Sequence, residues 1–137
     1  MDDQQAREYY VKIKTLREEV DKLSEQLQEI DGKTLEIHEM IQAVKQADEI
    51  QAGDELLVPL TNGVFIKATA KENQELLLNV GADSVVKKTP KQTVTLLKEQ
   101  QQSLTTFRQQ VTQKREEVAK QAQEVEEEVT KRIQEDV

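Results

Sequence analysis

Apolar residues that alternate in steps of four and three along the first third of the sequence constrain its fold more than any other feature. The series begins at Tyr9, ends at Val44 and is broken only by Thr34. Its members are Tyr9, Ile13, Leu16, Val20, Leu23, Leu27, Ile30, Thr34, Ile37, Ile41 and Val44. This spacing places one apolar stripe along a helix and is typical of a coiled coil. Gly32 leaves the register unchanged, so we expect a bend or a loosened turn there and not a helix end.

A second helical series begins after Pro90 and continues to the end of the sequence. Proline suits the first turn of a helix, and Thr89 before it is the expected N-cap. One half of the seam is apolar throughout, at Leu97, Leu104, Val111, Val118 and Val125. The other half is mixed, at Val94, Gln101, Arg108, Arg115, Ala122 and Val129.

The two series fit together if the helices are antiparallel and the residue numbers of facing positions add to 138. Val20 then faces Val118, and Leu27 faces Val111. Polar seam residues such as Arg108 fall near the middle of the pair, so we expect the middle of the coil to be less tight than its ends.

Between the helices the apolar spacing changes to alternation in short runs, which is typical of strands. We expect strands at 56–60, 64–70, 75–80 and 84–88. Asn62-Gly63 supplies the positive φ angles of a tight hairpin turn, and Gly81-Ala82-Asp83 is a second signal of the same kind.

The predicted fold is therefore mainly α: a long antiparallel two-helix coiled coil with two β-hairpins inserted at the bend. We expect an N-terminal coiled-coil helix over 1–50, a β-hairpin oligomerisation module over 51–89 and a C-terminal coiled-coil helix over 90–137.

Composition excludes several classes of function. The formal charge of −8 disfavours nucleic acid and anionic membranes as partners, and no apolar stretch is long enough for a membrane span. The absence of cysteine is compatible with a reducing compartment, so a cytoplasmic location is the default expectation. His38 is the only histidine, and no glycine-rich phosphate loop is present, so we expect no enzyme activity, no metal site and no cofactor.

One segment carries a family resemblance. Residues 56–68 read LLVPLTNGVFIKA and are followed by Val80-Gly81-Ala82 and Val85-Val86-Lys87-Lys88. The chain resembles prefoldin α subunits of the archaeal type, both in this sequence and in the order of its elements, which is helix, two hairpins, helix. It departs from many of them at residues 61–63, where they have a Gly-rich turn. The resemblance implies an ATP-independent chaperone in a hexamer with prefoldin β-type subunits, two α with four β. It also implies unfolded polypeptides as clients and their delivery to a group II chaperonin.

Two sets of residues are the candidate sites. We expect clients to bind at the coil tip, because a coiled coil frays at its open end and exposes apolar residues there, and because Tyr10 and Val11 point away from the seam. The tip residues are Tyr9, Tyr10, Val11, Ile13, Val125, Val129, Ile133 and Val137. We expect oligomerisation through the hairpins, because four short strands cannot enclose a core. Their apolar residues are Val58, Leu60, Val64, Ile66, Leu76, Leu78, Val80 and Val85.

Alternatives stay open for each of these features. The tip residues could simply close the coil, and the whole chain could be a structural coiled-coil adaptor or spacer subunit of another complex. A basic patch at Lys87, Lys88, Lys91 and Lys98 fits either edge-strand protection or chaperonin docking.

Overall fold

The structure consists of two long helices, with two β-hairpins between them in the sequence. It is a computed structural model that describes residues 1–72 and 75–136. The elements are α1 (Asp3–Ala47), β1 (Glu55–Thr61), β2 (Val64–Thr69), β3 (Leu76–Gly81), β4 (Ser84–Lys88) and α2 (Pro90–Glu135). The predicted fold class is confirmed, and the four predicted strands agree with the observed ones to within one residue at each end.

The chain divides into two compact units that are described separately below. The coil unit comprises Met1–Lys33 and Ser103–Val137, and the hairpin unit comprises Thr34–Gln102. This division cuts both helices, whereas the predicted parts 1–50, 51–89 and 90–137 follow the elements and stay a prediction.

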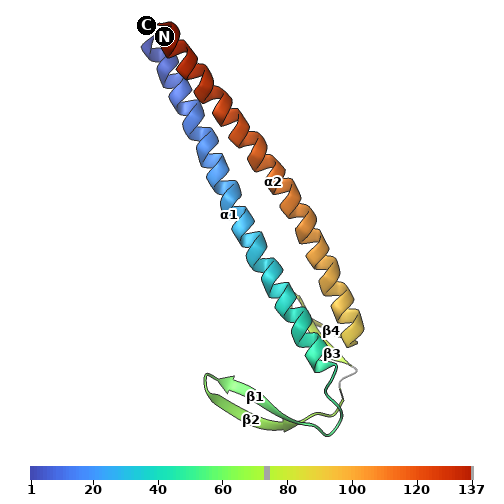
Figure 1. Cartoon of the computed structure of the whole chain (residues 1–137). Coiled ribbons are helices and arrows are strands. Elements are labelled where there is room, and N and C mark those ends of the chain that lie inside the picture. Colours follow the sequence, from blue (N-terminus) through green and yellow to red (C-terminus); the bar gives the residue numbers. More distant parts are fainter. Residues whose placement is uncertain (73–74, 137) are drawn as a thin grey trace. The chain divides into compact units, whose positions relative to one another are not determined.

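In the coil unit α1 and α2 lie side by side and antiparallel, with both chain ends at the same end of the pair (Figure 1). Every predicted seam residue of α1 is buried or half-buried, and so is every one of α2 except Arg108. Leu27 packs with Val111, as the predicted register requires. Burial of each such side chain stabilises a fold by roughly 1.5–3 kcal/mol, so the seam holds the two helices together.

The middle of the coil unit combines a buried apolar cluster with polar seam residues. Leu27, Ile30 and Val111 form the cluster, with Leu23 and Leu104 packed against it. The expectation that the middle is less tight than the ends stays a prediction, and both arginines of the mixed half of the seam reach polar partners on α1. Arg108 pairs with the Asp31 carboxylate through Nε at 2.8 Å and Nη2 at 3.4 Å, and Arg115 donates to the Ser24 hydroxyl at 3.4 Å.

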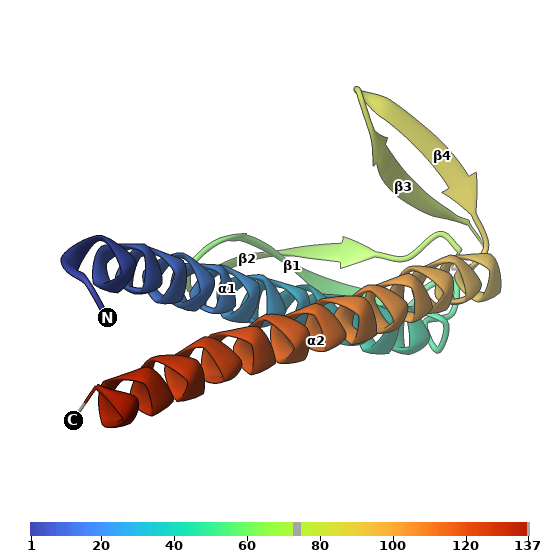
Figure 2. The ribbon, with the colours of Figure 1, turned by 90° about the horizontal axis from the view of Figure 1, so that it is seen from above.

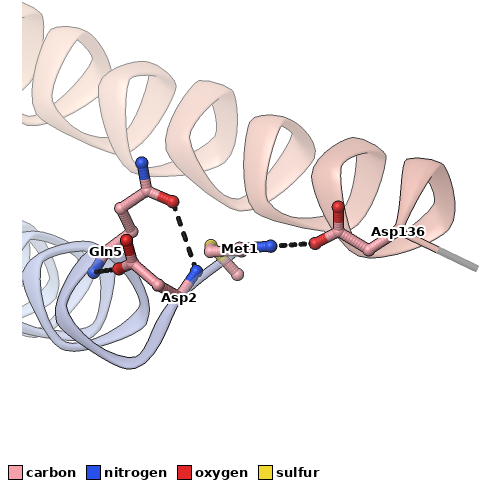
Figure 3. A network of polar contacts seen from close by, with 4 residues as sticks. All are labelled: Met1, Asp2, Gln5 and Asp136. Atoms are coloured by element: carbon pink, nitrogen blue, oxygen red, sulfur yellow. Dashed lines mark hydrogen bonds and ion pairs between the residues drawn. The ribbon is translucent and has the colours of Figure 1, made fainter.

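Both helices begin at a capping box. The Gln92 amide N–H donates to the Thr89 hydroxyl at 3.1 Å, and the Thr89 N–H donates to the Gln92 side-chain oxygen at 3.0 Å. These two bonds satisfy donors that a helix N-terminus leaves free, and they confirm Thr89 as an N-cap. At the other helix, Asp2 and Gln5 exchange the same pair of bonds (Figure 3). α1 itself continues without a break through Gly32.

In the hairpin unit the strands form two separate two-stranded antiparallel sheets, β1 with β2 and β3 with β4 (Figure 2). The turns differ in backbone conformation. At the first turn Gly63 has a φ of +76° and Asn62 is not left-handed. At the second turn Gly81, Ala82 and Asp83 all have positive φ, at 98°, 50° and 59°.

The second turn predicts that Ala82→Gly stabilises the β3–β4 hairpin by up to about 1 kcal/mol. A left-handed alanine costs about 1–2 kcal/mol, of which the greater freedom of glycine in the unfolded chain offsets part. Hydrogen exchange of the β3 and β4 amides should slow about two- to fivefold. The same change at Ala68, whose φ is not positive, should speed exchange in β1 and β2. Faster exchange in Ala82→Gly would contradict the strained turn.

The ion pair in the middle of the coil predicts that Asp31 contributes to the stability of the fold in a pH-dependent way. Its hydrogen bond with Arg108, aided by the guanidinium charge, lowers the pKa of this carboxyl below 3.8. A carboxyl whose pKa is lower in the folded than in the unfolded state stabilises the fold at pH values above the unfolded-state pKa. This stabilisation is lost as pH falls through the folded-state pKa. Asp31→Asn should therefore lower the thermal unfolding midpoint near neutral pH, and the difference should disappear as pH falls through the lowered folded-state pKa. Circular dichroism can follow both proteins, and a difference independent of pH would contradict the ion pair.

Candidate functional site

The tip of the coil, where residues 1–13 of the chain meet residues 125–136, is closed by contacts between the helices. The Tyr9 hydroxyl donates to Glu128 Oε1 at 3.0 Å, and the Arg132 guanidinium lies 5.6 Å from the centre of the Tyr9 ring. Arg132 also pairs with Glu128 at 3.7 Å. Partial burial and the bond to the Glu128 carboxylate raise the pKa of the Tyr9 phenol above its usual value, so it stays a proton donor.

A second contact joins the helices at the chain ends. The Met1 amine forms an ion pair with the carboxylate of Asp136, the residue after α2, beside the capping box of Asp2 and Gln5 (Figure 3). Further along the coil, Arg17 of α1 pairs with Glu126 of α2. Exposed pairs of this kind contribute about 0–1 kcal/mol each, so they orient the tip more than they stabilise it.

The predicted tip residues fall into two groups. Val125 is only 6% exposed, and Tyr9, Ile13 and Val129 are half-buried, so these four belong to the seam. Tyr10, Val11 and Ile133 are 67%, 59% and 52% exposed. Val137 lies outside the described residues. The exposed apolar surface of the tip therefore comes from side chains beside the seam.

The hairpins expose apolar side chains on both faces. In the first hairpin Val58 lies opposite Ile66 on one face, while Leu57 and Phe65, on the other face, are 63% and 56% exposed. In the second, Leu78 lies opposite Val86, and Leu77 on the other face is 69% exposed. Among the predicted oligomerisation residues Leu76 and Leu78 are half-buried, and the rest are exposed: Val58, Leu60, Val64, Ile66, Val80 and Val85.

Sequence reasoning missed three of the most exposed hairpin residues, which are Leu57, Phe65 and Leu77. The signal that could have found them is three consecutive apolar residues in each of β1, β2 and β3. Unbroken apolar runs indicate strands that are buried on both faces, whereas alternation of apolar and polar residues indicates strands that are buried on one face.

The lysines of the basic patch differ in their surroundings. Lys87 pairs with Glu75 at 3.9 Å, and Lys88 is half-buried, while Lys91 and Lys98 are exposed on α2. Edge protection and docking of an acidic partner both stay open for this patch.

Residues 1–72 and 75–136 contain neither a cluster of metal ligands nor a membrane-spanning helix. No group of three or more His, Cys, Asp and Glu side chains there could hold a metal ion. No helix in the described part of the chain is long and apolar enough to cross a membrane.

Comparisons with known proteins agree on one family. A sequence model described as prefoldin subunit matches residues 16–135. Prefoldin subunit alpha of Methanococcus maripaludis is 29% identical over 86 residues, a stretch that spans 63% of this chain and 58% of that protein. Prefoldin subunit alpha of Methanococcus aeolicus is 25% identical over 132 residues, which span 96% of this chain and 90% of that protein.

The fold has a solved counterpart. A filamentous PFD of Methanocaldococcus jannaschii, determined by cryo-EM, matches with a TM-score of 0.74 and 13% sequence identity. The match covers 83% of this chain and 94% of the other.

Proposed function

Since this chain belongs to the prefoldin subunit family, we propose that it is one subunit of an ATP-independent holdase that binds unfolded polypeptides at its coil tip. The observation that carries this proposal is the exposed apolar surface of Tyr10, Val11 and Ile133 beside a closed seam. Such side chains contribute nothing to closing the coil, and an unfolded chain offers matching apolar groups to cover them.

Assembly is the second part of the proposal. The β1–β2 sheet exposes Leu57 and Phe65 on one face and Val58 and Ile66 on the other. One chain does not cover both faces of such a two-stranded sheet. We propose that the hairpins join those of prefoldin β-type subunits, two α-type chains with four β-type chains, in a closed β body. The proposal includes a cytoplasmic location and delivery of clients to a group II chaperonin, both of which follow from the family alone.

Aggregation of a denatured enzyme tests client binding. The assembled protein should suppress aggregation without ATP. Replacing Tyr10, Val11 and Ile133 with serine should abolish most of that suppression, because the exposed apolar surface is lost while the seam is kept. Light scattering measures the outcome, and circular dichroism should show unchanged helicity.

A matched control is serine at Leu35 and Met40, which are exposed on α1 outside the tip. Full suppression should remain in this control. Unchanged suppression by the tip variant would refute tip binding, and no suppression by the wild-type assembly would favour the spacer alternative.

Leu78→Asp tests assembly through the hairpins. A carboxylate buried between subunits costs several kcal/mol, so the complex should dissociate at micromolar concentration while the helices stay folded. Native mass spectrometry and circular dichroism measure the two properties. Leu35→Asp on α1 is the control and should assemble normally. An intact complex with Leu78→Asp would place the subunit interface elsewhere.

A further inference from the structure

A hollow of about 440 Å³ lies along one side of the coil unit. Its wall on α1 follows the spacing of a single helix face, at Tyr10, Ile13, Lys14, Arg17, Glu18 and Asp21. Glu126 of α2 lines it from the other helix. We call this hollow the lateral groove.

The two ends of the lateral groove differ in chemistry. At one end lie the half-buried Ile13 and the ring of Tyr10, which is 67% exposed. At the other end lie the exposed carboxylates Glu18 and Asp21. The groove is thus apolar toward the tip, and away from it three acidic side chains, Glu18, Asp21 and Glu126, outnumber the two basic ones, Lys14 and Arg17.

The carboxylates of Glu18 and Asp21 are available to a partner. Arg17 is already paired with Glu126, and in the described part of the chain neither Glu18 nor Asp21 forms an ion pair or a hydrogen bond. The whole coil unit is acidic as well, with 17 Asp and Glu against 12 Lys and Arg in residues 1–33 and 103–137. Its field therefore attracts cationic segments and repels acidic ones.

The length of the groove sets the length of its occupant. Eleven residues separate Tyr10 from Asp21, which is about 16 Å along a helix and matches about five residues of extended chain. The apolar pair and the acidic pair are eight residues apart along α1, or about 12 Å, which an extended chain spans in three or four residues.

We propose that the lateral groove selects, among unfolded clients, extended segments with an aromatic or large aliphatic residue and a Lys or Arg three or four residues away. The apolar side chain lies against Tyr10 and Ile13, and the cation pairs with Glu18 and Asp21. This inference rests on the proposed function and names the class of client segment that one part of the tip takes. Each contact is weak, so several subunits of one assembly hold a long client together.

Peptide binding to the assembled protein tests the groove. The probe is a fluorescein-labelled peptide of about nine residues, Gly and Ser except for one Phe and one Lys four residues apart. Fluorescence anisotropy should show that it binds about three- to tenfold more tightly than the peptide with Glu in place of Lys, or with Ser in place of Phe. Added salt should reduce the preference for Lys over Glu and leave the preference for Phe over Ser.

Two pairs of matched variants locate the binding. Glu18→Gln with Asp21→Asn should weaken binding of the Lys peptide about three- to tenfold, whereas Glu25→Gln with Glu29→Gln, an equal charge change on α1 outside the groove, should change it less than twofold. Tyr10→Ser should weaken binding, and Leu35→Ser, at an exposed apolar residue of α1 outside both the tip and the groove, should not.

The outcomes separate this inference from the proposed function. Equal losses in the Glu18/Asp21 and Glu25/Glu29 variants would assign the preference to overall charge and overturn the groove. Unchanged peptide binding in the Glu18/Asp21 and Tyr10 variants would also overturn it, while suppression of aggregation by the same assembly would leave the holdase standing. An assembly that fails to suppress aggregation would overturn both.

Discussion

Burial of one narrow apolar stripe on each helix is the interaction on which the coil unit depends. A two-helix pair has a single seam, so each helix covers one stripe and leaves the rest of its surface to solvent. Leu27, Ile30 and Val111 fill the seam without help from neighbouring elements. The same constraint explains why Tyr10 stays exposed: no third helix covers it. A fold built on one seam therefore keeps its remaining apolar side chains available for other chains.

The hairpins reach the same condition by a different physical route. A two-stranded sheet has no interior, because each face must be covered by something outside the sheet. Leu57, Phe65 and Leu77 face solvent in the isolated chain, and the neighbouring Lys67 and Lys87 are paired with Glu55 and Glu75. A contiguous exposed apolar surface marks an interaction site or an aggregation liability. Exposure in the hairpin unit thus fits a permanent interface, whereas exposure at the tip fits a surface that is covered and uncovered repeatedly.

Periodicity predicted the elements well because each depends on local spacing and local capping. The seam from Tyr9 to Val44, the N-cap at Thr89 and the four strands all follow from residues within a few positions of one another. Features set by side-chain direction were not accessible in this way. Nothing local tells that Arg108 turns out of the seam to reach Asp31. The lateral groove depends on where Glu126 of α2 lies beside α1, which spacing along one helix cannot give.

The state of the tip changes the physical reason for client binding. The prediction from sequence rested on fraying, which would expose seam residues, and on Tyr10 and Val11, which point away from the seam. In the structure Tyr9 is held to Glu128 and lies beside Arg132, and Val125 is buried, so the seam is closed close to its end. Exposing those residues would cost the packing and hydrogen bonds that they make. Tyr10, Val11 and Ile133 are exposed at no such cost, because they lie beside the seam. Under the proposed function, such a tip would bind and release unfolded segments without opening, and a preformed surface lowers the entropy lost on each binding event.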